Sequence, residues 1–231
     1  MLNTASYANY KLTHTDQTFT DWLVKSAGPT WNKAISHPFT SAIGGDTVSA
    51  EAVTRYLLED YYYIQDLASA LGFLIAKAPT MASKARLSTF AHNLTSNELD
   101  FFQRTFKELG VEPEVYENFE PSSVARAIGA MLLSTAGKGH YIDGMTTLLA
   151  TEWIYREWGL REASKPRPKR PYLAEWVAFL ACDEFGEFID WLKHEVNVHG
   201  DEERAQRQSE ISESFTHMCE LEVDFFDMVS G

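Results

Sequence analysis

Proline placement is the feature of this sequence that most restricts its fold. The eight prolines all fall between segments with a helical apolar period, at positions 29, 38, 79, 113, 121, 166, 168 and 171. Because proline breaks a helix interior and cannot donate to a β ladder, these positions mark the ends of elements. Between them no segment shows the period of two that indicates a half-buried strand. The sequence therefore predicts an all-α protein.

The apolar periodicity predicts helices over residues 15–27, 29–36, 49–77, 80–109, 122–136, 141–159, 172–182, 184–198 and 201–229. Residues that commonly cap helices support these bounds, namely Thr15 or Asp16, Ser122 or Ser123, and the C-terminal glycines Gly28, Gly110 and Gly159. The acids of "GDEER" are expected on the first turn of the last helix. No internal repeat interrupts the pattern, so we expect one domain over residues 1–231.

Composition excludes several classes of partner. A net charge of −13 argues against nucleic acid, because phosphate binding needs clustered Lys and Arg. The basic cluster "KPRPKRP" at 165–171 is broken by proline and is interpreted as a solvated loop. No run approaches the ~20 apolar residues of a membrane span, and the N-terminal stretch lacks the apolar segment of a signal peptide. Two cysteines, Cys182 and Cys219, suit a reducing compartment. We expect a cytoplasmic protein.

The stretch "LLEDYYYIQDL" at 57–67 places a carboxylate on a core face. The apolar stripe of its helix runs through Val53, Leu57, Asp60, Ile64, Leu67, Leu71 and Leu74. Asp60 interrupts it, with Tyr56 and Tyr63 one turn away on the same side. Glu59 and Asp66 lie off this face and are expected in solvent. A buried acid needs a partner or a chemical role, so the alternative is a structural Asp60 satisfied by a tyrosine or a basic side chain.

The last helix carries a second inward acid. Its stripe runs through Ile211, Phe215, Met218, Glu222, Phe225 and Val229. A carboxyl group among rings has a raised pKa, which suits a general acid or base. A structural Glu222 paired with Lys or Arg is the alternative. Glu220 and Asp224 lie off the stripe and are expected in solvent.

A third helix adds "TTLLATEWIYREWG", where Thr151 and Tyr155 share a face and Glu152 flanks it. A threonine on such a face usually bonds a backbone carbonyl one turn back, so Thr151 alone indicates nothing. Inward acids beside tyrosines nevertheless predict a polar pocket within a helical bundle, suited to a small, flat, hydrogen-bonding ligand.

Metal binding is the main competing interpretation, because di-iron sites also lie inside helical bundles. Such sites need Glu three residues before His, and none of the seven histidines has one. A His-x-x-x-Asp-x-x-His spacing, a P-loop, a dinucleotide fingerprint, a Gly-x-Ser-x-Gly elbow and Cys-x-x-Cys are absent too. We therefore expect neither a metal nor another cofactor.

Four segments in order resemble the TenA family (thiaminase II, aminopyrimidine aminohydrolase) of the haem-oxygenase-like all-α superfamily, which also holds PqqC. They are "HPFTSAIGGDTVSAEAVTRYLLEDYYYIQDLASALGFLIAKAP", "LLATEWIYREWG", "EWVAFLACDEFGEFIDWL" and "FTHMCELEVDFFDM". The resemblance covers nearly the whole chain. It implies a single-domain haem-oxygenase-like bundle that forms a homodimer or homotetramer, without nucleic-acid or membrane partners.

The resemblance also assigns site residues. By position, Asp60 matches the aspartate that binds the pyrimidine, Glu222 the catalytic acid/base, and Tyr63, Tyr155 and Phe225 match aromatic residues of the pocket. The family's nucleophilic cysteine falls on Thr151, and two pocket tyrosines fall on Ile128 and Leu180. A threonine has no accessible anion near neutral pH, so covalent capture of thiamin is in doubt.

This pattern resembles the cysteine-lacking branch called TenA_E. It implies hydrolysis of an amino- or formylamino-pyrimidine in thiamin salvage. Glu222 is then the acid/base, Asp60 orients the ring, and Thr151 or Glu152 places the water. Two alternatives remain: a non-catalytic pyrimidine-binding or regulatory protein, and a PqqC-like oxidase on the same fold. Cys182 lies two residues after Leu180 and is interpreted as a buried structural thiol.

Overall fold

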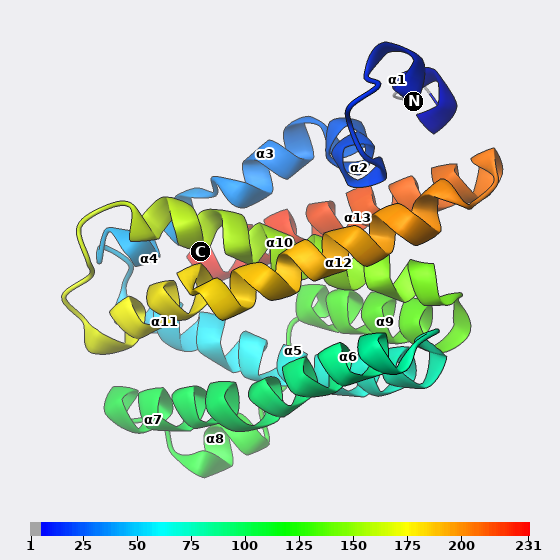
Figure 1. Ribbon diagram of the computed structural model, residues 1–231. Coiled ribbons are helices and arrows are strands. Elements are labelled where there is room, and N and C mark those ends of the chain that lie inside the picture. Colours follow the sequence, from blue (N-terminus) through cyan, green and yellow to red (C-terminus); the bar gives the residue numbers. More distant parts are fainter. Residues whose placement is uncertain (1–5) are drawn as a thin grey trace.

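The protein is all-α, as the sequence predicts. The computed structural model describes residues 6–231, and among these no residue forms a strand. The helices are α1 (Tyr7–Thr13), α2 (Phe19–Ala27), α3 (Pro29–Ile35), α4 (Pro38–Gly44), α5 (Ala50–Lys77), α6 (Met81–Asn93), the π-helix η1 (Leu94–Glu98), α7 (Leu99–Leu109), α8 (Pro113–Glu117), α9 (Ser123–Lys138), α10 (Tyr141–Ala163), α11 (Pro171–Ala181), α12 (Asp183–Asp201) and α13 (Ala205–Ser230). In Figure 1, α10 lies inside the bundle, while α1 and the α7–α8 pair lie at opposite edges.

The centre of the bundle is α10. Residues 144–155 of this helix are buried without a break, as expected for a helix that is covered on all sides. It packs against α9, α11, α12 and α13, which surround it in the fold. A polar side chain within residues 144–155 is therefore an internal group wherever it points.

Several predicted element bounds are wrong. The sequence pattern did not predict the short helices α1, α4 and α8. Thr18, rather than Thr15 or Asp16, caps α2, in a reciprocal capping box with Asp21. The predicted helix over 80–109 contains the π-helix η1 between two α-helices. The last helix begins at Ala205, so the acids of "GDEER" lie before its first turn and not in it.

Two of the three expected glycine stops are confirmed, and the third is wrong. Gly28 and Gly110 end helices with φ of 56° and 71°, values that favour glycine. Gly159 instead lies inside α10. A Cβ atom there would stand 2.5 Å from the Cβ atom of Leu180, so this glycine allows α11 to approach α10 closely.

The prediction that Glu59 lies in solvent is also wrong. Its side chain is buried, and both carboxylate oxygens accept a hydrogen bond from the Ser122 amide at 3.0 and 3.2 Å. Ser122 is the N-cap of α9, so Glu59 places a negative charge at the positive end of that helix. Asp66 is half-buried, whereas Glu220 and Asp224 are exposed as expected.

Residues 164–170, between α10 and α11, are mostly exposed, in line with a solvated loop. Arg170, the last residue of this loop, is nevertheless anchored, because its guanidinium pairs with Asp46 and also donates to the Val48 carbonyl at 2.7 Å. Among the helices of residues 6–231, none combines the length and apolar character that a membrane crossing requires.

Candidate functional site

Three long helices and the π-helix bring four carboxyl groups together. Asp60 comes from α5, Glu98 from η1, Glu152 from α10 and Glu222 from α13, and at most 9% of each residue is exposed. None of the four forms a salt bridge with a Lys, Arg or His of the described residues. A basic partner for Asp60 or Glu222 is therefore wrong for the described part of the chain, whereas the tyrosine partner considered for Asp60 is present, because the Tyr56 hydroxyl bonds its carboxyl group.

Two of these groups have a buried oxygen without a hydrogen-bond partner in the described structure. They are Asp60 Oδ2 and Glu222 Oε2. A buried polar atom left unpaired costs free energy, and such atoms in a native fold call for an explanation. A ligand that brings donors to both oxygens supplies one.

Glu152 is bonded only at long distances. Its Oε1 accepts from the Tyr63 hydroxyl at 3.4 Å and from Thr151 Oγ1 at 3.3 Å. Thr151 Oγ1 also lies 3.0 Å from the Leu148 carbonyl oxygen, one turn back. A threonine hydroxyl has a single proton to donate, so Thr151 divides it between Leu148 and Glu152.

Burial without a cation raises the pKa of all four carboxyl groups. Burial raises the pKa of Asp60 to about 7, partly offset by the Tyr56 hydroxyl. Burial and the Asp60 charge raise the pKa of Glu152 to about 8. Burial, followed by the charges of Asp60 and Glu152, raises the pKa of Glu98 and of Glu222 well above its usual range. The cluster therefore holds protons at neutral pH, as acid/base chemistry requires.

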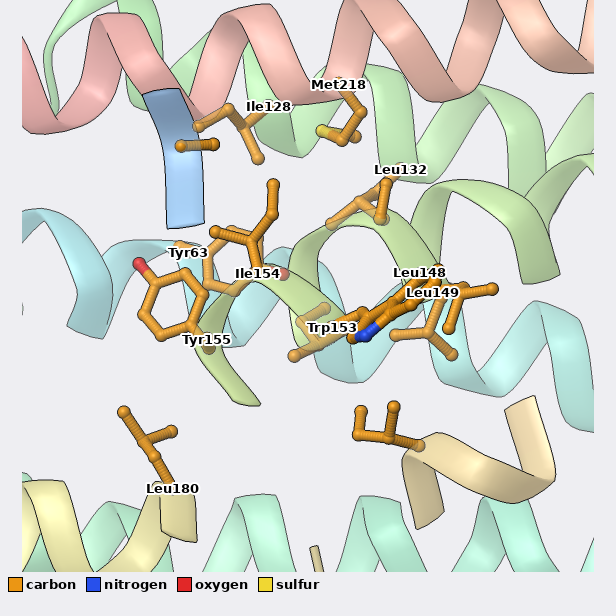
Figure 2. Close-up of a cluster of buried hydrophobic side chains, with 14 of the residues drawn as sticks. Tyr63, Ile128, Leu132, Leu148, Leu149, Trp153, Ile154, Tyr155, Leu180 and Met218 are labelled. Carbon is orange, nitrogen blue, oxygen red and sulfur yellow. The ribbon is translucent and has the colours of Figure 1, made fainter. Parts of the chain in front are cut away.

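Aromatic residues form the walls around these acids. The Trp176 Nε1 donates to the Tyr56 hydroxyl at 3.0 Å, which ties α11 to α5. The ring centroids of Tyr56 and Phe225 are 6.0 Å apart. In Figure 2, Ile128 and Leu180 lie on opposite sides of the Tyr63 and Tyr155 rings. The site thus has aromatic walls, and its polar groups are the carboxyl groups and the tyrosine hydroxyls.

Two narrow cavities meet at Asp60, Tyr63 and Tyr155. The deeper one, of about 10 Å³, is also lined by Ala125, Ile128, Glu222 and Phe225. The outer one, of about 20 Å³, is also lined by Leu67, Phe90, Glu98, Glu152, Trp176, Phe179, Leu180 and Phe185. Each has room for about one water molecule. A ring binds here only when the side chains between the two cavities move apart.

Most of the residues singled out from the sequence come together at these cavities. Eight of the nine predicted site residues line one or both of them, namely Asp60, Tyr63, Ile128, Glu152, Tyr155, Leu180, Glu222 and Phe225. Thr151 is buried but is not among the lining residues; it lies behind Glu152. Cys182 is not the buried thiol that the sequence predicts, because it is half-buried and lines a neighbouring chamber.

Sequence reasoning missed Glu98. The spacing test that found Asp60 could have found it, because Leu87, Phe90, Leu94, Glu98 and Phe101 follow one another at intervals of three or four residues. Trp176, Phe179 and Phe185 were missed as well, and no local signal marks them. They reach the site because α11 and α12 fold back onto the helices that carry the acids.

The described residues contain no group of three or more His, Cys, Asp and Glu side chains arranged to hold a metal ion. The four carboxyl groups share one site without a common coordination point.

Comparisons with known proteins show the family and the fold of this chain. The sequence profile of the TENA/THI-4/PQQC family matches residues 24–231. The chain belongs to this family. The aminopyrimidine aminohydrolase of Halalkalibacterium halodurans is 26% identical over 207 residues, covering 89% of this chain and 92% of the relative.

Solved structures place this family member in a known fold. A TenA homologue from Pyrococcus furiosus superposes with a TM-score of 0.83 at 24% identity, over 91% of this chain and 99% of the other. A domain with a haem oxygenase-like fold from Shewanella denitrificans superposes with a TM-score of 0.67 at 12% identity, over 91% of each chain. The haem-oxygenase-like bundle predicted from the sequence is confirmed.

Proposed function

We propose that this TenA family member hydrolyses an aminopyrimidine, or its N-formyl form, in thiamin salvage. The observation that carries the proposal is the pair of unpartnered buried oxygens, Asp60 Oδ2 and Glu222 Oε2, at a site walled by aromatic rings. The relative from H. halodurans, named aminopyrimidine aminohydrolase, supports the same substrate class.

Asp60 is the group that recognises the ring. An aminopyrimidine presents a ring nitrogen that accepts a hydrogen bond next to an amino group that donates one. A protonated carboxyl group offers the complementary donor and acceptor, and with its pKa raised to about 7, Asp60 carries that proton in about half of the molecules at neutral pH. Tyr63, Tyr155 and Phe225 provide the apolar walls on which the ring stacks.

Glu222 acts as general acid/base at the deep end of the site. It lines the deeper cavity only, so a ring held at Asp60 meets it at an edge. A proton that Glu222 gives to a nitrogen at this edge withdraws electrons from the ring. This activates the exocyclic carbon that carries the leaving amino group. A water oxygen then bonds to that carbon, the carbon–nitrogen bond breaks, and ammonia leaves with the proton that the water has lost.

Glu152 is the group that holds the water. It lines the outer cavity, whereas Glu222 lines the deeper one. Thr151 orients this carboxyl group through its 3.3 Å contact and does not itself attack the substrate. A nucleophilic alkoxide at Thr151 would need a base that removes the hydroxyl proton, and this proton is shared with the Leu148 carbonyl.

The test is to incubate the protein with 4-amino-5-aminomethyl-2-methylpyrimidine and with its N-formyl form, and to follow ammonia and formate. We expect ammonia from the first substrate, formate from the second, and loss of about 100-fold or more in kcat for the amine with Glu222→Gln. The exposed Glu220→Gln, on the same helix, is the matched control. Release of neither product by the wild type contradicts the proposal.

A non-catalytic pyrimidine-binding protein is the second candidate. The position of Thr151 behind Glu152 favours it, because the position of the family's nucleophile contributes no group to the cavities. Calorimetry separates the two: tight binding of the aminopyrimidine without turnover would establish a binding protein.

A further inference from the structure

A third chamber opens next to the site. It has about 200 Å³ of space and lies between α6–η1 on one side and α11–α12 on the other. Four of its lining residues, Phe90, Glu98, Phe179 and Phe185, also line the outer of the two narrow cavities. The chamber therefore continues the site beyond Glu98, and unlike the narrow cavities it is large enough for several carbon atoms without rearrangement.

The chamber is apolar inside and acidic at its edge. Phe90 and Phe188 stack in it with ring centroids 3.9 Å apart, and Leu94 lies among the lining residues. Glu184 and Glu187 belong to its rim, and the one basic side chain there, Arg86, already donates to the Glu187 carbonyl at 3.1 Å. Such surroundings favour an uncharged apolar group and disfavour an anion.

Glu98 stands where the chamber meets the site. It is 9% exposed and lines both spaces. Burial and the charges of Asp60 and Glu152, without a hydrogen bond, raise the pKa of its carboxyl group. It comes from the π-helix, an irregular turn that is costly in a helix and common at functional sites. A buried, unpartnered acid at a junction is placed to bond whatever group passes through.

We propose that the chamber is a subsite for the acyl group of N-acylated aminomethylpyrimidines larger than the N-formyl compound, with Glu98 as the catalytic carboxyl group at the amide. This inference rests on the proposed function, since it needs the ring at Asp60. The ring then lies in the two narrow cavities, the amide at Glu98, and the apolar acyl chain among Phe90, Leu94 and Phe188.

The proposed reaction at Glu98 is amide hydrolysis. The Glu98 carboxylate takes a proton from water as the water oxygen bonds to the acyl carbon. Glu98 then gives this proton to the amide nitrogen as the carbon–nitrogen bond breaks, which releases a carboxylic acid and the free aminomethylpyrimidine. The raised pKa of Glu98 makes its carboxylate a stronger base than that of an exposed glutamate, and the rate is therefore expected to rise with pH as Glu98 loses its proton.

The first experiment compares acyl chains on the wild-type protein. The N-acetyl and N-butyryl derivatives of 4-amino-5-aminomethyl-2-methylpyrimidine have amides of similar reactivity and differ by two methylene groups. We expect kcat/KM to be about 15-fold higher for the butyryl compound, and at least about 10-fold lower for the anionic N-succinyl compound than for the butyryl one. Equal values for acetyl and butyryl overturn the proposal.

Two matched variants locate the effect. Thr89 is exposed and lines this chamber alone, so Thr89→Trp places a large ring at its edge. We expect the ratio of butyryl to acetyl kcat/KM to fall towards one in this variant. Ser88, the preceding residue of α6, is also exposed but does not line the chamber. Ser88→Trp is therefore expected to keep the wild-type ratio of butyryl to acetyl kcat/KM. A ratio that Thr89→Trp leaves unchanged contradicts the assignment.

Glu98→Gln tests the chemistry separately from the binding. Gln keeps the size and the hydrogen-bonding capacity of Glu98 but carries no proton between atoms. We therefore expect kcat for the butyryl amide to fall about 100-fold, KM to stay within about threefold, and one limb of the pH–rate profile to disappear. The exposed Glu108→Gln of α7 is the control. Unchanged kcat in Glu98→Gln overturns the role of Glu98.

The outcomes separate the two proposals. If the free amine yields ammonia while no acyl compound is hydrolysed, the proposed function stands and the acyl subsite is wrong. If neither the amine nor any acyl compound reacts, both are wrong.

Discussion

At the scale of single residues, Thr151 and Glu152 are neighbours in the sequence that differ in their access to the site. The resemblance puts it where the family carries a nucleophilic cysteine. In the structure its hydroxyl is engaged by the Leu148 carbonyl and by Glu152, and the carboxyl group of Glu152 is what reaches the cavity. On α10 it is therefore Glu152, and not Thr151, that can meet a ligand in the cavity.

Replacement of Thr151 follows from this arrangement. We expect Thr151→Ala to lower kcat/KM for the aminopyrimidine by no more than about 10-fold, because it removes one long hydrogen bond to Glu152 and no cavity-lining group. Glu152→Gln is expected to lower it by about 100-fold or more, since it removes the carboxylate that holds the water. Steady-state kinetics of both variants checks this, and a larger loss in Thr151→Ala would assign the threonine a direct role.

Asp60 and Glu222 were predictable because the evidence for them is local. Each interrupts an apolar stripe within its own helix, so the sequence of one element is enough to place it on the core face. Glu59 shows the limit of that test: it lies off the stripe, yet it is buried because the N-terminus of α9 packs over it. A partner from a distant part of the chain decides its environment, and no period within α5 reports that.

At the scale of elements, the close approach of α10 and α11 fixes the position of Leu180 in the site. We expect Gly159→Ala to destabilise the fold by about 1–3 kcal/mol, because the new Cβ atom would stand 2.5 Å from the Cβ atom of Leu180 and 3.2 Å from its backbone carbonyl carbon. Since Leu180 lines the outer cavity, KM for the aminopyrimidine should rise as well.

Gly72→Ala provides the matched comparison. Gly72 lies inside α5, is exposed, and has no atom within 4 Å of the place that a Cβ would take. We expect this change to stabilise the fold by about 1 kcal/mol through helix propensity alone. Thermal unfolding of the two variants side by side should move the melting temperature in opposite directions; a shift of the same sign in both would contradict the packing argument.

The π-helix η1, which separates α6 from α7, is a feature that the helical period of the sequence does not predict. Residues 80–109 have a helical period throughout, so the sequence predicts one helix there, and a π-turn within it leaves no separate signal. Glu98 lies at the end of that turn, and it lines a chamber only because residues of α11 and α12 close the other side. The helices are therefore predictable one by one, whereas the chamber between them is a property of their packing.

At the scale of the whole molecule, the carboxyl cluster makes stability depend on pH. An unperturbed Asp60 loses its proton near pH 3.8, whereas burial raises its pKa in the folded protein to about 7. Between these values the folded chain binds more protons than the unfolded chain, so the free energy of unfolding falls as pH rises. The raised pKa of Glu152 likewise lowers the free energy of unfolding as pH rises, up to about pH 8.

Ion pairs near the surface make the free energy of unfolding rise with pH in the acid range. Hydrogen bonds from Lys33 and His37 lower the pKa of Asp227, and Arg170 lowers that of Asp46. Their contribution to stability is present above the ordinary aspartate pKa and is lost as pH falls through the lowered values. Maximum stability is therefore expected near the ordinary aspartate pKa, at about pH 4, with a decline on the alkaline side that belongs to the buried cluster.

Asp60→Asn should reveal this decline. Between pH 5 and 8 the wild-type protein is expected to lose about 3 kcal/mol through Asp60, since each pKa unit corresponds to ~1.4 kcal/mol, which lowers the melting temperature by several degrees in a chain of this length. In Asp60→Asn this part of the loss disappears, so the variant gains on the wild type steadily as pH rises. The exposed Asp224→Asn of α13 should follow the wild-type curve. Parallel curves for Asp60→Asn and wild type would mean that Asp60 is ionised in the folded protein at pH 5, and the cluster would then need a cation that balances it.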